Sequence, residues 1–190
     1  IDIRWKPWVA PFAIYGQVAG EDEDKFLPNA LMFQYGLETW FELSSGSARI
    51  FTEYVDLTSI WWTGDPHTRN VSYEHTIYLD GYRYLGRPVG HWADTDSKIM
   101  SLGALYLNNN GTGLGINIRS GDINEDGTGK SSVSNGIAID YLSVELFHSR
   151  VYHRSDMKVF TSIGWEERSN KLNFNSDEGI SYYISLNKTF

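Results

Sequence analysis

The sequence predicts an all-β protein, a transmembrane antiparallel β-barrel of the outer-membrane type. Apolar and polar residues alternate with a period of two through most of the 190 residues, which is the period of a β-strand. Short and long connections between these segments alternate strictly, as the short periplasmic turns and long outer loops of such barrels do. Aromatic residues make up 15% of the chain, alongside 18 Gly, a composition that fits a β-rich surface protein or a membrane barrel whose apolar faces are diluted by polar ones.

Nine strands are expected from the alternation. In the segment 30–43, for example, odd positions carry Leu31 and Leu37, whereas even positions carry Gln34 and Glu38. No window of useful length sustains the 3.6-residue period of a helix. The expected strands cover residues 1–6, 12–20, 30–43, 48–59, 97–108, 112–121, 137–150, 155–167 and 179–190.

The expected connections fall into two classes. The short ones cover residues 7–11, 44–47, 109–111 and 151–154, and the long ones cover residues 21–29, 60–96, 122–136 and 168–178. A soluble sandwich has no reason to separate its loops in this way, because both of its ends face water. We therefore expect a single barrel region over residues 1–190, with a long extracellular loop at about 60–96 and a location in the bacterial outer membrane.

The last expected strand ends in Phe190, with Tyr182, Ile184 and Leu186 on one face. This pattern resembles the closing strand of bacterial outer-membrane proteins, whose terminal aromatic residue is read by the assembly machinery. With Phe190 at the periplasmic edge, nine strands put Ile1 on the outer side, whereas single-chain bacterial barrels have even strand numbers and both termini in the periplasm. The chain is therefore expected to be the C-terminal half of a larger barrel, unless one strand is miscounted.

Charge and composition exclude several other classes. The chain carries 24 Asp+Glu against 16 Lys+Arg, a formal charge of −8, which argues against nucleic acid as a partner. It contains no Cys, so thiolate nucleophiles and Cys-based metal sites are excluded. The longest apolar runs are too short for a transmembrane helix.

One acidic segment resembles the start of a calcium loop. Asp122, Asn124 and Asp126 alternate, and Gly127 follows, but the twelfth position is Val133, where a bidentate Glu is expected. A solvated acidic turn is the preferred interpretation. We expect neither a metal nor a cofactor.

The strand face opposite the apolar stripe is expected to line the barrel interior. It combines charges of both signs with Tyr and Gln, which suits either a water-filled pore or a plug of paired charges. Its members are Asp2, Arg4, Lys6, Tyr15, Gln17, Gln34, Glu38, Glu42, Asn117, Arg119, Tyr141 and Glu145.

The long segment 60–96 carries the candidate binding residues. It begins with Trp61, Trp62, Asp65, His67, Arg69, Tyr73, His75, Tyr78 and Asp80. Aromatic rings stack on the apolar faces of sugars, and Arg makes bidentate hydrogen bonds to carboxylates, so this composition suits a surface for acidic polysaccharide. It suits equally an aromatic girdle with a loop packed into the barrel mouth.

The rest of this segment resembles a family motif. It reads Gly81-Tyr82-Arg83-Tyr84-Leu85-Gly86-Arg87-Pro88-Val89-Gly90-His91, followed by Asp94 and Asp96. The stretch is similar to the G-Y-R-Y-x-G-R-x-x-G-H stretch of the capsule assembly Wzi family. Three other segments are similar to the family's barrel segments in the same order: Tyr15-Gly16-Gln17, Gly36-Leu37-Glu38 and Glu53-Tyr54. The resemblance implies a large outer-membrane lectin barrel that holds capsular polysaccharide at the cell surface, with this chain as its C-terminal portion.

The resulting hypothesis is a lectin without catalytic activity. Its expected partners are capsular polysaccharide, outer-membrane lipid and, through the strand ending in Phe190, the barrel-assembly machinery. The residues expected to contact sugar or organise the loop are Tyr82, Arg83, Tyr84, Arg87, His91, Trp92, Asp94 and Asp96.

Two alternatives stay open. A porin-type diffusion channel for small solutes would have the same strand pattern. A rim protease would pair His91 with Asp94 and Asp96 to activate water. A barrel lipase is not expected, because the adjacent His148 and Ser149 point to opposite faces of a strand.

Overall fold

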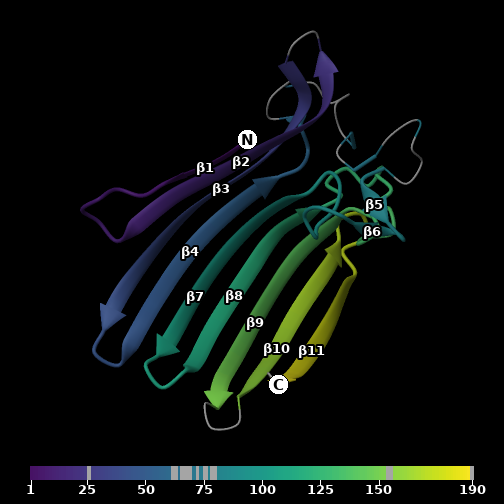
Figure 1. Cartoon of the computed structure of the whole chain (residues 1–190). Helices are drawn as coiled ribbons and strands as arrows, with labels where there is room; N and C mark the ends of the chain where they lie inside the picture. Colours follow the sequence, from purple (N-terminus) through teal and green to yellow (C-terminus); the bar gives the residue numbers. More distant parts are fainter. Residues whose placement is uncertain are drawn as a thin grey trace.

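The computed structural model describes residues 1–24, 27–60, 64, 70–71, 73–74, 77, 81–152 and 156–188. Nine strands form one antiparallel sheet in chain order, so that each strand pairs with its neighbours along the chain (Figure 1). The strands are β1 (Asp2–Trp5), β2 (Phe12–Asp24), β3 (Leu27–Leu43), β4 (Gly46–Asp56), β7 (Lys98–Asn108), β8 (Thr112–Ile123), β9 (Ile139–Tyr152), β10 (Met157–Asn170) and β11 (Ser176–Lys188). This architecture confirms the all-β fold and the nine expected strands.

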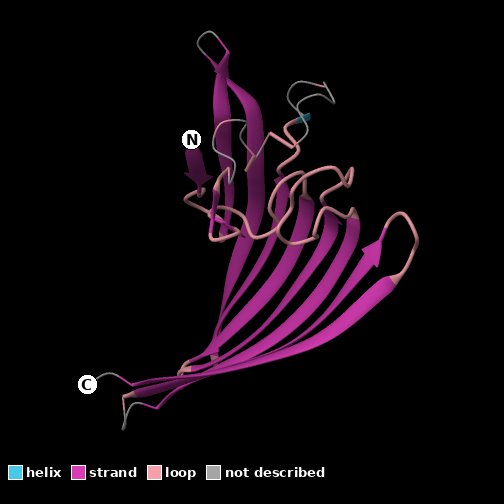
Figure 2. Ribbon diagram, turned by 90° about the vertical axis from the view of Figure 1, so that its right-hand side faces the viewer, coloured by secondary structure: helices cyan, strands magenta, loops and turns pink. Residues whose placement is uncertain are grey.

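The sheet is strongly curved, like part of a barrel wall, and the long loops gather at one end of it (Figure 2). It is not closed within the described residues, because β1 and β11 lie at its two edges. No helix in the described part of the chain is long and apolar enough to cross a membrane.

The long connection expected at residues 21–29 is wrong, because β2 and β3 continue to pair as far as Asp24 and Leu27. Two expectations about the segment after β4 also need correction. The strand expected to reach residue 59 ends at Asp56, because the backbone N–H and the hydroxyl of Thr58 both donate to the Asp56 carboxylate and turn the chain. The loop that follows also contains a hairpin that was not expected. It consists of β5 (Arg83–Tyr84) and β6 (Arg87–Pro88), which pair with each other.

The register of the sheet confirms the two expected faces. On the outer face, large apolar side chains stay between 43% and 55% exposed: Leu37, Ile50, Leu102, Leu114, Leu146 and Ile163. On the inner face, polar side chains meet across strand pairs, such as Gln17 with Gln34 and Asn117 with Glu145. An apolar outer face of this extent is what a barrel wall presents to lipid.

Charged residues of the inner face are paired. Arg4 and Arg49 both form ion pairs with Glu38, whose side chain is 7% exposed. The hydroxyl of Tyr15 donates to Glu53 at 3.0 Å. These contacts pair charged and polar side chains along the inner face of β1–β4.

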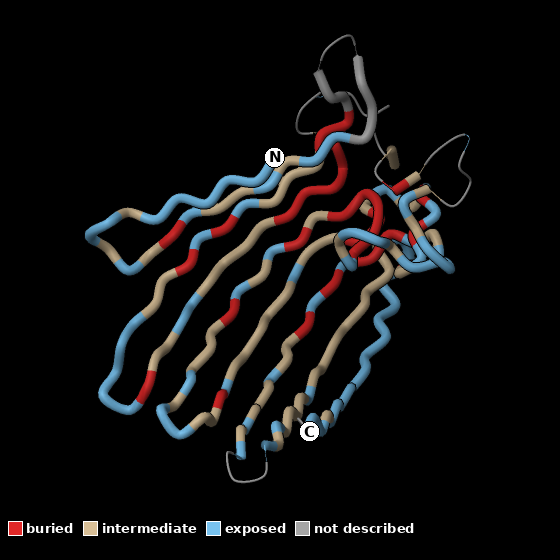
Figure 3. Tube along the Cα trace, in the orientation of Figure 1, coloured by how far each residue is buried: buried red, intermediate tan, exposed pale blue. Residues whose placement is uncertain are grey.

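Buried residues concentrate where the strands meet the long loops, whereas the opposite end of the sheet has few (Figure 3). Two apolar clusters lie there. One contains Ala93, Ile99, Ile123, Ile139 and Tyr141, and the other contains Val55, Leu57 and Tyr73. These two apolar clusters therefore hold the long loops against one end of the sheet.

Candidate functional site

The loop between β4 and β7 is organised around Tyr73, which is only 5% exposed. The backbone carbonyl of Tyr73 accepts hydrogen bonds from the backbone N–H of Tyr82 at 3.1 Å and from Arg83 Nη1 at 3.0 Å. Its hydroxyl oxygen accepts the backbone N–H of His91. One buried residue therefore holds both ends of the segment 82–91 in place, one end through its backbone carbonyl and the other through its hydroxyl.

The glycines of this segment make that arrangement possible. A Cβ at Gly81 would lie 1.8 Å from the Tyr73 carbonyl oxygen, and a Cβ at Gly90 would lie 2.3 Å from the Tyr73 hydroxyl. Gly86 has a φ of +73° in the two-residue turn between β5 and β6, a conformation that favours glycine. The three glycines of the motif therefore shape the loop and its contact with Tyr73.

Arg83 and Asp94 form a buried ion pair within the loop between β4 and β7, and Asp94 also bonds to the loop between β8 and β9. Arg83 Nη2 lies 2.7 Å and Arg83 Nε 2.9 Å from the Asp94 carboxylate oxygens, and the two side chains are 7% and 0% exposed. The backbone N–H and the hydroxyl of Ser132, in the loop between β8 and β9, donate to the same carboxylate at 2.8 and 2.7 Å. Burial alone would raise the pKa of Asp94, but the hydrogen bonds from Arg83 and Ser132 outweigh it and hold this pKa below its usual value.

A second connection between these loops runs through Asp96, which is fully buried. Its carbonyl accepts the backbone N–H of Glu125 at 2.8 Å, and its carboxylate accepts that of Asp126 at 3.3 Å. Lys98 Nζ lies 3.0 Å from the Glu125 carboxylate. Asp94 and Asp96 thus organise the loops from within.

The aromatic and basic residues of the motif lie nearer the surface. Tyr82 is 59% exposed and Tyr84 is 72% exposed. Arg87, at the start of β6, is also exposed. Trp92 packs against Tyr141 of β9 with ring centroids 5.1 Å apart and keeps 36% of its surface exposed. The structure therefore divides the predicted residues into an inner group (Arg83, Asp94, Asp96) and a group that solvent reaches (Tyr82, Tyr84, Arg87, Trp92).

A cavity of about 730 Å³ lies between this loop and the inner face of the sheet. Tyr73, Tyr82 and His91 line it from the loop side. Gln17 of β2 and Gln34 of β3 line it from the sheet, with Met32 and Val55 beside them. The volume is within the range of sites that bind small molecules or single residues of a polymer. We call this space the mouth cavity.

Only Tyr82 and His91 of the mouth cavity belong to the predicted site residues. The sequence predicted Gln17 and Gln34 only as members of the polar strand face. It singled out Tyr73 only as one of several aromatic residues in the long loop. Nothing in the sequence places the three together, because the contacts that unite them join β2, β3 and the loop.

His91 is neutral at physiological pH. Burial lowers its pKa to about 4, and the nearby positive charge of Arg119 adds to this effect. Its Nδ1 accepts the backbone N–H of Ala93 at 3.3 Å. The Asp94 carboxylate, which the protease alternative pairs with His91, accepts hydrogen bonds from Arg83, Thr95 and Ser132.

The described residues do not bring together the ligands of the calcium loop that the segment 122–127 resembles. Among them, no three His, Cys, Asp or Glu side chains lie close enough together to hold a metal ion. Asp122 instead pairs with Lys171 at 2.7 Å, and Asn124 bonds with Gly129. The remaining loop residues named above lie outside the described residues: Trp61, Trp62, Asp65, His67, Arg69, His75, Tyr78 and Asp80, and so does Phe190.

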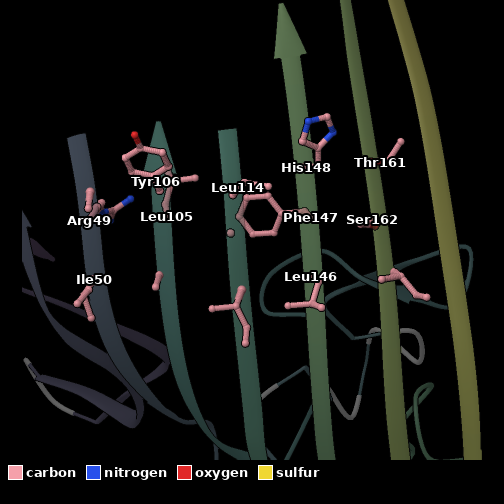
Figure 4. Close-up of a pocket in the computed structure, with 15 residues that line it drawn as sticks. Arg49, Ile50, Leu105, Tyr106, Leu114, Leu146, Phe147, His148, Thr161 and Ser162 are labelled. Atoms are coloured by element: carbon pink, nitrogen blue, oxygen red, sulfur yellow. The ribbon is translucent and has the colours of Figure 1, made fainter. Parts of the chain in front are cut away.

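A second hollow, of about 650 Å³, lies on the outer face across β4 and β7–β10 (Figure 4). Ile50, Leu114 and Leu146 contribute to it from three of these strands. The only polar groups on its outward side come from Tyr106, His148 and Thr161, among the described residues that line it. This lining suits hydrocarbon better than a sugar, as expected for the outer face of a barrel.

Comparison with known proteins gives two matches. The family model for capsule assembly protein Wzi matches residues 1–179. A solved structure, described as Wzi, an outer membrane protein of Escherichia coli involved in group 1 capsule assembly and a carbohydrate-binding β-barrel, superposes with a TM-score of 0.81 at 23% sequence identity. The match covers 97% of this chain and 40% of that one, so the chain spans less than half the length of that protein. A search of curated proteins gave no match.

Proposed function

Because the chain belongs to the capsule assembly protein Wzi family, we propose that it forms part of an outer-membrane β-barrel that binds acidic capsular polysaccharide. In this role it attaches or assembles the capsule at the bacterial cell surface and performs no catalysis. The polar inner face, the apolar outer face and the loops gathered at one end are all consistent with that location.

The observation that carries the proposal is the mouth cavity. An aromatic ring that is both exposed and held by its backbone is suited to stack on a sugar ring. Tyr82 has these properties, since its side chain is 59% exposed and its backbone N–H is bonded to the buried Tyr73. The amide groups of Gln17 and Gln34 can both donate to and accept from sugar hydroxyls.

The acidic groups of the polysaccharide require a cation, and Arg87 is the candidate. Its guanidinium is exposed on the hairpin, whereas that of Arg83 is engaged by Asp94 and by the Tyr73 carbonyl. We place Tyr84, which pairs with Arg87 across the hairpin, at the same outer contact. The ring of Trp92 lies 5.6 Å, centroid to centroid, from the imidazole of His91, which lines the mouth cavity, and we assign Trp92 to the same sugar contact.

The proposal is tested by capsule partitioning in the source strain. Deleting the gene is expected to move polysaccharide from washed cells to the medium at unchanged total amount. The full-length gene carrying Tyr82→Ala is expected to restore cell-bound capsule only partly. Leu172→Ala, an 82% exposed residue of the turn after β10, is the matched control and should restore it fully. Unchanged cell-bound capsule in the deletion strain would refute the proposal.

A porin is the competing function, and the structure gives one reason to rank it lower. The described loops fold over the end of the sheet and pack there. We therefore expect the full-length protein to give no stable single-channel conductance in a planar bilayer.

A further inference from the structure

The chemistry of the mouth cavity suggests which part of the polysaccharide enters it. Among the described residues that line it, none carries a formal charge at neutral pH. The titratable ones are the hydroxyl groups of Tyr73 and Tyr82 and the imidazole of His91. Burial raises the pKa of Tyr73 above its usual value and lowers that of His91 to about 4, so both stay neutral.

The cations that the described residues place around the mouth cavity are already engaged. Arg4 and Arg49, which line the adjoining hollow beyond Gln17 and Gln34, both pair with Glu38. Arg83 is 7% exposed, and its donors go to the Asp94 carboxylate and the Tyr73 carbonyl. Arg119, whose charge acts on His91, lies 3.8 Å from the Glu145 carboxylate and is absent from the described lining.

A carboxylate that enters this space would therefore lose water without gaining an ion pair, which is unfavourable. A neutral pyranose loses much less on entry. Its hydroxyls can exchange water for the side-chain amides of Gln17 and Gln34, and its apolar face can lie on the ring of Tyr82.

We propose that the mouth cavity selects an uncharged sugar residue of the polysaccharide, while the acidic residues are recognised outside it, at the exposed Arg87. This inference rests on the proposed function and narrows it. The protein then recognises a repeat that contains a neutral residue next to an acidic one.

The test compares two forms of one ligand. The capsular polysaccharide of the source strain is used in its native form and after reduction of its carboxyl groups to alcohols, which removes the charge and leaves the backbone intact. Binding to the folded full-length protein is measured by intrinsic fluorescence at about 0.5 M NaCl, where long-range electrostatic attraction is screened.

The reduced polysaccharide is expected to bind within about threefold of the native form under these conditions. Tyr82→Ala should weaken both forms by about tenfold, the effect of losing one aromatic stacking contact. Tyr82→Phe should retain most of the affinity. Arg87→Ala should weaken the native form and leave the reduced form unchanged.

Two results would overturn the inference, and they are distinguishable. Binding of the native form alone, with the reduced form lost, would mean that the mouth cavity takes the acidic residue, while the lectin function stands. Binding of neither form by the wild-type protein would remove the proposed function as well as the inference.

Discussion

At the scale of single residues, the loop depends on the buried contact between Arg83 and Asp94. Each side chain alone would be a buried charge that has lost its closest counter-charge, since the two are 7% and 0% exposed. Removing one partner of such a pair costs about 3–5 kcal/mol, more than the intact pair contributes relative to neutral residues. The two residues are therefore expected to act as a unit.

Arg83→Met is predicted to open the loops locally without unfolding the barrel. The Asp94 carboxylate would lose its guanidinium partner but keep the backbone N–H groups of Thr95 and Ser132. Hydrogen exchange in the segments around these two amides should accelerate. In the Arg83→Met/Asp94→Asn double variant the effect should be smaller than the sum of the single effects. Arg87→Met, on the exposed strand of the same hairpin, is the control and should leave exchange unchanged. Additive effects of the two single substitutions would contradict the prediction.

The lowered pKa of His91 predicts that the stability of the folded loop depends on pH. Its pKa is lowered from 6.5 to about 4 in the folded protein, so between these values the opened loop binds a proton that the folded loop does not. The contribution of neutral His91 to the stability of the folded loop is fully present above pH 6.5, and it is lost as the pH falls towards 4. Limited proteolysis of the loop should therefore become faster as the pH is lowered from 6.5 to 4.

The control for this prediction is His91→Gln, which should abolish the acceleration between pH 6.5 and 4. The contribution of Asp94 falls in a lower window, because its pKa is lowered below its usual value of about 3.9. Its stabilisation is lost only as the pH falls below that value. A variant without His91 that keeps the wild-type pH profile would contradict the assignment.

At the scale of elements, several inner-face aromatic rings lie directly over glycines of the neighbouring strand. A Cβ built at Gly36 would be 2.3 Å from the Tyr15 ring, at Gly103 2.2 Å from the Phe51 ring, and at Gly115 2.0 Å from the Phe147 ring. The glycines in these strands therefore make room for large neighbours, which is one recognised reason for glycine inside a strand.

Gly115→Ala is therefore predicted to destabilise the sheet by about 1–3 kcal/mol, the typical effect of overpacking. Gly16→Ala is the matched control, because its Cβ would meet its nearest atom, the Gln34 carbonyl oxygen, at an ordinary 3.5 Å. The measurement is the urea concentration at which the folded, heat-modifiable form disappears on gels. Replacement of Phe147 by Leu should restore part of the stability. Equal effects of the two glycine substitutions would rule out the steric explanation.

The strands were predicted more accurately than the loop. The expected strand 137–150 corresponds to β9 (Ile139–Tyr152), since alternation is repeated over many residues and small errors at the ends do not change it. The hairpin of β5 and β6 has two residues in each strand, which is too short for any alternation. Its geometry depends on Tyr73 and on the turn at Gly86, and neither is visible as a period.

At the scale of the whole molecule, the two faces of the sheet differ in polarity. Along β11, Ile184 points outward and Ser185 points inward, according to their partners Thr161 and Phe160. The two positions are adjacent in the strand and so lie at nearly the same depth along the barrel wall. The same substitution at each should therefore change folding stability by different amounts.

Ile184→Arg is predicted to cost about 2–4 kcal/mol of folding stability in a bilayer, the value for Arg on a lipid face near the midplane. Ser185→Arg should cost much less, because a polar interior tolerates charge. The folded fraction of the full-length protein in lipid vesicles, titrated with urea, gives both values. Similar costs at the two positions would indicate that the outer face does not meet lipid.

The sequence by itself determined the strand order and the face of the sheet to which the alternating strand residues belong. These properties are local, since a period of two and a run of turn residues act within one strand and its neighbour. Only the tertiary structure decided the roles within the motif. In that structure Arg83 and Asp94 form a buried pair, whereas Tyr82 and Arg87 stay accessible to solvent. Which residues are buried depends on the contacts that Tyr73 makes with Arg83 and that Ser132 makes with Asp94. Ser132 is 38 residues from Asp94 in the chain, and contacts at such separations leave no periodic trace in the sequence.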